Sequence, residues 1–239
     1  MKGIKLMKFI FSLLILFPGL ASGQNLDRIL ETHFEAIGQE NLMAMRSIFM
    51  EVREMDGFKE GKKYQITKKA PNKIRIEGTY KELSFVNAFD GKTAWTIAPW
   101  TGVLSAQLMT DRERHLFLMN AGIGSPLYDH GLGNTLAVIG SERSDDANHY
   151  VIRSTMPSGF YVDYLLDKKN HLIHLARVYK EDEPEKVEVE VIFKNYKNLG
   201  GVSVPFAFEN RSERSIFDIV IDDIIFGQGV PNSFFNKPE

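Results

Sequence analysis

The sequence predicts a mainly β fold, in which one large antiparallel sheet curves and is covered by amphipathic helices. From Ser47 onward, apolar and polar residues alternate with a period of two, which is typical of antiparallel strands with one buried face. Before Ser47 the apolar period is helical, and a capping-box sequence indicates one more helix in the middle of the chain. Open twisted sheets rarely exceed about ten strands. A sheet of about eleven strands is therefore expected to curl.

Three helices are predicted as covers for the sheet. The first has an apolar stripe at helical spacing, formed by Leu26, Ile29, Leu30, His33, Phe34 and Ile37. Asn25 is placed to cap its start and Gly38 to end it, and a short second helix follows over residues 39–45. In the inserted helix, residues 111–119, Thr110 and Glu113 form the capping box. Residues 121–134 contain four glycines and a proline, which predicts a mobile or irregular loop.

The strands are predicted from alternation and turn signals. Tyr64 and Ile66 alternate with polar neighbours, as do Ile74 and Ile76. Residues 83–89 lead into Asp-Gly at 90–91, a two-residue hairpin signal, with a return strand over 92–98. Later strands are predicted at residues 136–141, 149–154, 161–166, 172–179, 186–193, 206–210 and 216–226.

Residues 1–23 have the pattern of a signal peptide. Three lysines precede an apolar stretch over residues 9–17, which is shorter than the roughly 20 residues needed to cross a bilayer. Small residues at Ala21 and Gly23 predict cleavage before Gln24. We therefore expect export to a periplasm, and a mature chain, residues 24–239, that forms one soluble domain of 216 residues.

The composition excludes several classes of protein. The chain has no cysteine, so it has no disulfide, no thiolate metal site and no cysteine for lipidation. The mature chain has a net charge of about −5 and no basic stripe, which argues against a nucleic-acid partner. His171 and His174 are three residues apart, so on a strand they face opposite sides and do not form a metal site. No nucleophile-elbow or dinucleotide motif occurs, so we expect neither an enzyme nor a cofactor.

A set of residues around the Asp-Gly turn resembles a known family pattern. A Pro-Asn turn leads into a strand, and a second strand is followed by Asp-Gly-Lys-Thr-x-Trp and a proline four residues later. The matching positions are Pro71, Asn72, Asp90, Gly91, Lys92, Thr93, Trp95 and Pro99. This pattern resembles the LolA-like family, periplasmic carriers that ferry lipoproteins to the outer membrane. Residues 195–205 are also similar to outer-membrane lipoprotein-sorting proteins of that family.

The resemblance implies an incomplete β-barrel whose apolar inner wall holds acyl chains beneath a helical lid. On this interpretation the cavity is lined by Ile74, Ile76, Phe85, Trp95, Val187, Val189 and Val191. The lid residues are Leu116, Phe117 and Met119. From the residues alone, the same inward positions favour a filled core, and the resemblance reverses that preference. Trp95 suits sheet packing and ligand contact equally. The best-known carriers have an arginine just before the Pro-Asn turn that holds the lid closed. Ala70 stands there, so either the lid is controlled differently or the cargo is not a lipoprotein.

The expected function is therefore that of a monomeric periplasmic chaperone for lipoprotein transport. The implied partners are lipoprotein or lipid acyl chains, an inner-membrane exporter and an outer-membrane acceptor. A second hypothesis is a periplasmic sensor domain that binds a lipid or lipoprotein and signals through a partner protein. A third, an enzyme acting on lipid or glycan, has no supporting motif.

Overall fold

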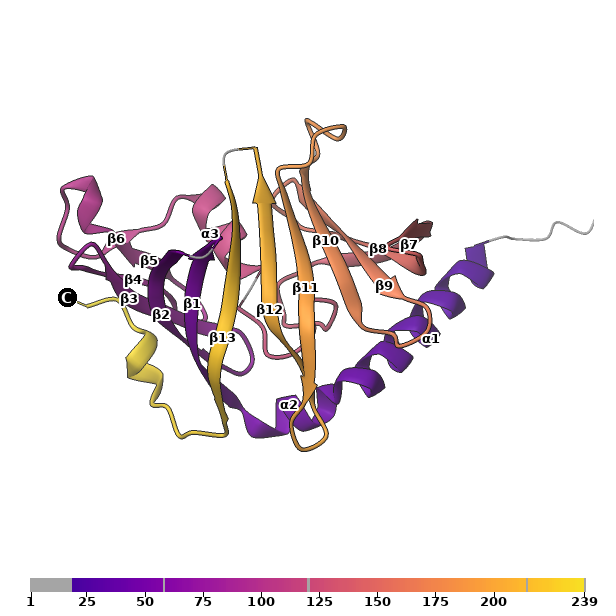
Figure 1. Ribbon diagram of the computed structural model, residues 1–239, viewed down its shortest axis with the longest axis horizontal. Coiled ribbons are helices and arrows are strands. Elements are labelled where there is room, and N and C mark those ends of the chain that lie inside the picture. The colour runs from indigo at the N-terminus through magenta and orange to yellow at the C-terminus, as the bar shows by residue number, and fades with distance from the viewer. Residues whose placement is uncertain (1–18, 58, 120, 214, 239) are drawn as a thin grey trace, which may run out of the picture.

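The computed structural model describes residues 19–57, 59–119, 121–213 and 215–238. Within them the strands form one antiparallel sheet of thirteen strands, which curves without closing into a barrel (Figure 1). The strands are β1 (Ser47–Asp56), β2 (Lys59–Lys69), β3 (Lys73–Tyr80), β4 (Leu83–Phe89), β5 (Ala94–Ile97), β6 (Gln107–Leu108), β7 (Thr135–Ser144), β8 (Ala147–Thr155), β9 (Phe160–Asp167), β10 (Ile173–Lys180), β11 (Val189–Asn198), β12 (Ser203–Ser212) and β13 (Ile216–Phe226). The predicted sheet is confirmed, but the predicted count of about eleven is too low. β6 has only two residues, which is too short for a period-two signal.

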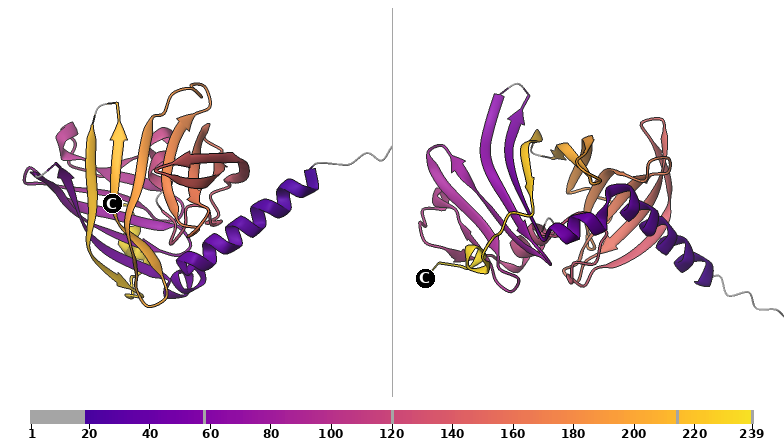
Figure 2. Two further views of the ribbon diagram at one scale, coloured as in Figure 1. Left: turned by 45° about the vertical axis from the view of Figure 1, so that its right-hand side comes forward. Right: turned by 90° about the horizontal axis from the view of Figure 1, so that it is seen from below.

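The sheet consists of two meanders joined in the middle. Its spatial order is β6-β5-β4-β3-β2-β1-β13-β12-β11-β10-β9-β8-β7, so β1 and β13 pair at the centre. The two edge strands, β6 and β7, are neighbours in the sequence. The chain between them must therefore cross the open side of the curved sheet. We call β1–β6 the first arm of the sheet and β7–β10 the second arm (Figure 2).

The helices are α1 (Gly19–Ile37), α2 (Gln39–Met45), α3 (Asp111–Leu118) and two short 3-10 helices, η1 (Pro99–Thr101) and η2 (Asn232–Phe235). Seen from below, α2 lies in the gap between the two arms, and α1 runs from there across the second arm (Figure 2). Ile29 of α1 belongs to the core of the second arm, and Leu42 of α2 belongs to the core around β1 and β13. The apolar stripe predicted from the sequence is thus the surface that packs on the sheet.

Gly38 ends α1 as predicted. Its φ of 70° is left-handed, and a Cβ at this position would lie 2.1 Å from the carbonyl oxygen of Gly201. Both the conformation and the close approach of the β11–β12 turn therefore require glycine. The predicted cap at Asn25 is wrong, because α1 begins at Gly19 and Asn25 lies inside it. The signal-peptide prediction falls largely on residues 1–18, outside the described residues.

Two strand predictions need correction at their ends. β4 and β5 form the predicted antiparallel hairpin, but residues 90–93 separate the two strands instead of two residues. The Asp90 carboxylate accepts hydrogen bonds from the amides of Lys92 and Thr93 at 2.8 and 2.7 Å. β5 consequently begins at Ala94. β11 begins at Val189 rather than at residue 186, which leaves Val187 in the preceding connection.

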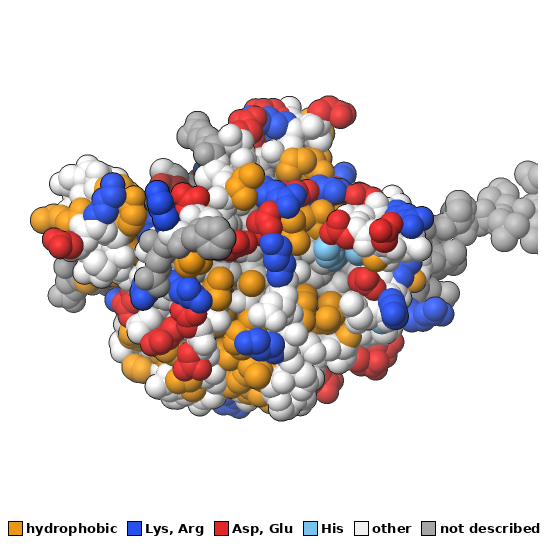
Figure 3. All heavy atoms as spheres, in the orientation of Figure 1, with side chains coloured by type: hydrophobic (Ala, Val, Ile, Leu, Met, Phe, Trp, Pro, Cys, Tyr) orange, Lys and Arg blue, Asp and Glu red, His pale blue; other side chains and the backbone are white. Residues whose placement is uncertain are grey.

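The outer face of the sheet is polar along its centre. Figure 3 shows acidic and basic side chains interspersed over the face formed by β11, β12 and β13. Many of them form cross-strand ion pairs, such as Arg53 with Asp222 at 2.8 Å and Arg177 with Glu190 at 3.1 Å. Neighbouring charges of opposite sign leave no basic stripe on this face.

Candidate functional site

The concave side of the sheet encloses a cavity of about 590 Å³. This volume falls within the roughly 300–1,000 Å³ of small-molecule sites. The floor is the sheet, and α1, α2, α3 and the loop after α3 close the other sides. Most lining side chains are apolar, among them Ile48, Met50, Val52, Ile66, Val162, Phe193, Phe208, Ile219 and Ile221. The inner wall is therefore not completely filled by the protein's own side chains.

Six of the ten residues predicted from the resemblance line this cavity. Ile74 and Ile76 lie on β3, and Val189 and Val191 lie on the inward face of β11. Leu116 and Met119 line it from α3 and the residue that follows, and Leu116 is 37% exposed at the mouth. These six residues line the cavity, and their contact with a lipid remains a prediction.

The other four predicted residues lie outside the lining. Trp95 is on the convex face, because its neighbour Ala94 faces inward with Ile74 and Phe89. The Trp95 indole N–H donates a hydrogen bond of 2.9 Å to the carbonyl oxygen of Phe235, in η2. The C-terminal segment therefore buries Trp95 against the outside of the first arm.

Phe85, Phe117 and Val187 are absent from the lining for different reasons. Phe85 packs between Tyr64 and Trp100, near the first residue of β4. Phe117 packs into the core of the first arm and is not part of the cavity lining. Val187 is 37% exposed, because β11 begins two residues later.

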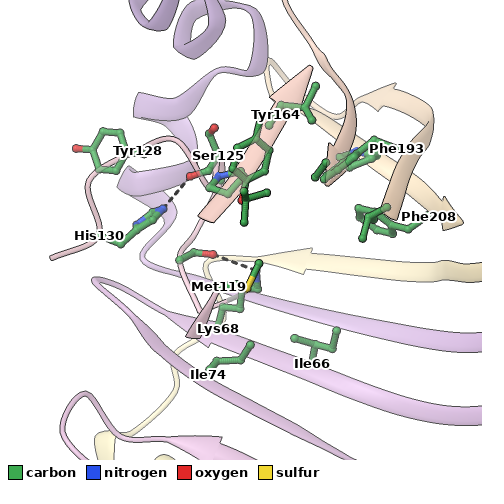
Figure 4. Close-up of a pocket in the computed structure, with 18 of the residues that line it drawn as sticks. Ile66, Lys68, Ile74, Met119, Ser125, Tyr128, His130, Tyr164, Phe193 and Phe208 are labelled. Atoms are coloured by element: carbon green, nitrogen blue, oxygen red, sulfur yellow. Dashed lines mark hydrogen bonds between the residues drawn. The ribbon is translucent and has the colours of Figure 1, made fainter. Parts of the chain in front are cut away.

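A lysine projects into the apolar cavity from the sheet. Lys68 is on β2, on the same face as Tyr64 and Ile66, and Figure 4 shows it among Ile66, Ile74 and Met119. Its ammonium group donates a hydrogen bond of 3.0 Å to the carbonyl oxygen of Gly122. Desolvation inside the protein lowers the pKa of Lys68 to about 8. The sequence pattern contains this signal, a lysine at an inward position of an alternating strand, but the prediction did not use it.

The loop at residues 121–134 is irregular, as predicted, and several of its residues are buried. Gln39 of α2 donates to the carbonyl oxygen of Ile123 at 3.0 Å and accepts from the amide of Ser125 at 2.8 Å. Gly124, with a φ of +85°, lies so close to Gln39 that a Cβ would be 2.2 Å from its side-chain oxygen. This contact holds the loop against α2 as one wall of the cavity.

His33 joins α1 to the same loop. Its Nδ1–H donates to the carbonyl oxygen of His171 at 2.7 Å, so the neutral ring accepts at Nε2 from the Ser125 hydroxyl, also at 2.7 Å. Burial lowers the pKa of His33 to about 4. The apolar stripe of α1 already included His33, which signals a buried polar contact, but its partners are distant in sequence.

The distance of 2.7 Å between the Ser125 hydroxyl and His33 Nε2 is the one feature that this pair shares with the nucleophile and base of a hydrolase. A base with a pKa near 4 is a weak proton acceptor at neutral pH. The Ser125 hydroxyl also accepts from the amide of Leu127 at 3.1 Å, and the side chain is 3% exposed. These contacts fix the serine as part of the loop wall.

Further contacts fix the far end of the loop. The His130 ring donates through Nε2 to the carbonyl oxygen of Ser125 at 2.9 Å (Figure 4), and Asn72 donates to the carbonyl oxygen of His130 at 3.2 Å. Burial lowers the pKa of His130, so the ring is neutral at pH 7. The Pro-Asn turn thus contacts the loop through Asn72.

The two histidines considered as a metal pair lie apart. His174 is 2.9 Å from the carboxylate of Asp145 and stacks on His149, whereas the carbonyl oxygen of His171 accepts from His33. Across the described parts of the chain, no three His, Asp or Glu residues group closely enough to hold a metal ion. In the same residues, no helix is both long and apolar enough to cross a membrane.

Solved structures share this architecture. A LolA superfamily protein from Nitrosomonas europaea aligns with a TM-score of 0.63 and 16% identity, over 90% of this chain and 98% of that one. A putative outer membrane lipoprotein-sorting protein domain from Vibrio parahaemolyticus aligns with a TM-score of 0.58 and 10% identity, over 86% and 97%. A DUF1329 family protein from Desulfovibrio piger aligns with a TM-score of 0.59 and 10% identity, over 87% and 97%.

These alignments confirm that the chain has the LolA-like fold, a half barrel with a helical cover. No family model and no curated protein matches the sequence. At these identities the likeness concerns the fold alone.

Proposed function

We propose that this protein is a periplasmic carrier that binds the acyl chains of lipoproteins or other lipids inside the half barrel. The observation that carries the proposal is the cavity of about 590 Å³ with its mostly apolar wall. The sequence left open whether the inward residues line a void or fill a core. A void enclosed by aliphatic side chains, with little directional chemistry, suits a hydrocarbon guest.

Burial of the hydrocarbon supplies the affinity. Each methylene removed from water contributes about 0.8 kcal/mol. A chain of roughly 16 carbons therefore gains on the order of 10 kcal/mol before the costs of ordering are subtracted. Such a guest needs no hydrogen bond to be held, and a transporter must also be able to release it.

A lid that spans the mouth provides a route for release. α3 belongs to the connection between the two edge strands, and its residue Arg112 lies near the Lys180–Glu188 ion pair of the second arm. Leu116 contacts the cavity from the same helix. Movement of α3 away from the second arm would open the mouth and expose the guest.

The lid contact differs from that of the best-known carriers. Ala70 packs in the core around β1 and β13 and offers no side-chain donor. Lys68, two residues earlier and facing inward, contacts the carbonyl oxygen of Gly122 instead. We propose that this hydrogen bond stabilises the closed position of the loop next to α3.

The proposal includes export through the signal peptide at residues 1–23 and transfer of cargo toward the outer membrane. It also includes an inner-membrane donor, an outer-membrane acceptor and a monomeric, non-catalytic mode of action. The His33–Ser125 geometry supports the last point, because both groups serve to fix the loop.

The test is to isolate the protein from a Gram-negative periplasm and to record its native mass spectrum. We expect a bound species whose mass, after release, identifies an acyl-containing molecule. Competition of a neutral fluorescent acyl probe by long-chain esters gives a second readout. A protein that carries no lipid and binds no probe would overturn the proposal, and turnover of the ester would point to an enzyme instead.

A further inference from the structure

Lys68 is half-buried, and its ammonium group has few partners in the protein. It can donate three hydrogen bonds, and one of them is made, to the carbonyl oxygen of Gly122. Among the described residues, no carboxylate lies within ion-pair distance of it. Its lowered pKa has desolvation as the cause, without an acidic neighbour to offset it. The cavity therefore contains a positive charge without a counter-ion.

Such an arrangement is costly in the protein alone. A desolvated charge without a counter-ion destabilises the folded state, and a methionine or leucine would fill the same position on β2 without that cost. With a pKa near 8 the amine is still mostly protonated at neutral pH. The charge thus persists in the cavity and is available to a negative group that enters with the guest.

We propose that Lys68 binds the carboxylate of the guest, and that the ligand is a long-chain amphiphile with one anionic head group. This inference rests on the proposed function and narrows its ligand class. The hydrocarbon tail would occupy the aliphatic wall formed by residues such as Ile66 and Val191. The head group would accept the hydrogen bonds that the ammonium group does not use.

The charges around Lys68 favour a carboxylate over a phosphate. A single compact cation matches a monoanion, whereas phosphate monoesters usually meet several donors or an arginine fork. Arg112 lines the cavity from α3 and lies near Glu188. The negative charge of Glu188 therefore offsets the positive charge of Arg112 at the rim of the cavity. The neighbouring His130 is neutral at pH 7 because its pKa is lowered. Lys68 is thus the cation available inside the described part of the cavity.

The charge on Lys68 can be tested by changing the pH, because the other titratable groups near it keep their charge state. From the loop these are His130 and the exposed Asp129, and from its own strand Tyr64, whose pKa is raised by burial. Between pH 7 and 10 the imidazole stays neutral and the phenol stays protonated. Lys68 is therefore the group near the site that changes charge in this window.

The experiment compares palmitic acid with methyl palmitate as competitors of a neutral fluorescent acyl probe, with the mature chain. For the wild type at pH 7 we expect about a tenfold preference for the acid, which is the usual range for a hydrogen bond to a charged group. Lys68→Met should abolish the preference, and Lys68→Arg should retain it. Lys63→Met, which removes an exposed lysine from the opposite face of β2, should leave it unchanged. The wild-type preference should decline from pH 7 to 10, while that of Lys68→Arg should persist.

The outcomes separate the two proposals. Equal affinity of the wild type for acid and ester overturns the role of Lys68 and leaves acyl binding intact. Failure to bind either one overturns the proposed function. A stronger preference for lysophosphatidic acid than for palmitic acid overturns the carboxylate assignment in favour of phosphate. If Lys68→Met does not fold, the wild-type pH series and Lys68→Arg still decide the question.

Discussion

The Nε2 atom of His33 and the hydroxyl oxygen of Ser125 lie 2.7 Å apart in the interior, and their hydrogen bond joins α1 to the loop that forms a cavity wall. In the neutral imidazole Nδ1–H donates to the carbonyl oxygen of His171, so Nε2 accepts from the serine hydroxyl. Protonation would place a second donor opposite the serine hydroxyl. The position of the loop is therefore coupled to the protonation state of one histidine.

Acid should destabilise the protein through His33. Burial lowers its pKa from 6.5 to about 4, so below pH 6.5 the unfolded chain binds a proton that the folded protein does not. The free energy of unfolding then falls as the pH falls from 6.5 towards 4, by an amount approaching about 3 kcal/mol. Above pH 6.5 this contribution is fully present.

Urea unfolding at pH 7.5, 6.5, 5.5 and 5 checks this expectation. His33→Gln should show a shallower dependence on pH than the wild type, whatever its stability at pH 7.5. His130 and His149 also have lowered pKa values, so part of the dependence should remain in the variant. Parallel curves for the two proteins would contradict the assignment to His33.

Leu116 and Phe117 are neighbours on α3, but only Leu116 lines the cavity. Leu116→Ser should weaken binding of an acyl probe several-fold and change stability little, because the side chain is already 37% exposed. Phe117→Ser should lower the free energy of unfolding by about 2 kcal/mol, because it removes a ring from the core of the first arm. Probe titration and urea unfolding of both variants give the two readouts. The reverse pattern would mean that α3 turns its other side towards the guest.

Local signals in the sequence predicted local structure well. The second helix has the predicted bounds, Gln39–Met45, and Thr110 and Glu113 form the predicted capping box. Both features depend on residues within one or two turns of each other. Alternation likewise predicted the inward positions of Ile74, Ile76, Val189 and Val191, because each belongs to a strand with one polar face.

Contacts between distant segments were not predictable in this way. Ala94 and Trp95 are both apolar, so alternation does not say which of them faces inward. The answer depends on Phe235, which is 140 residues away in the sequence and covers Trp95 from outside. Similarly, Lys68 has its partner at Gly122 and His33 has its partner at Ser125, and no periodic pattern connects these pairs.

The contact between Trp95 and Phe235 should matter for stability and not for ligand binding. Both side chains are almost completely buried, and both lie outside the cavity lining. Phe235→Ala should lower the free energy of unfolding by about 3 kcal/mol or more. Phe234→Ala, which removes a half-buried ring beside Arg75, should cost less and serves as the control. Urea unfolding measures both costs, and a loss of acyl-probe affinity in folded Phe235→Ala would show that the first arm transmits strain to the cavity.

The inner wall of β11 offers the most direct test of where the guest lies. Val191 lines the cavity, and the next residue, Ile192, packs on the convex side against Val151, Leu165 and Leu175. Val191→Phe should occupy part of the void and reduce affinity for a chain of about 16 carbons by roughly tenfold, while shorter chains lose less. Because the added ring enters free space, its effect on stability should stay within about 1 kcal/mol.

Ile192→Phe is the matched control, since it adds a similar volume to the opposite face of the same strand. It should leave affinity for every chain length unchanged, although crowding of the convex cluster is expected to lower stability. Competition of the fluorescent probe by saturated esters of 8 to 16 carbons gives the length dependence for each variant. If Val191→Phe binds all lengths as the wild type does, the hydrocarbon does not occupy this wall, since a guest that fills the cavity must compete with the new ring for the same volume.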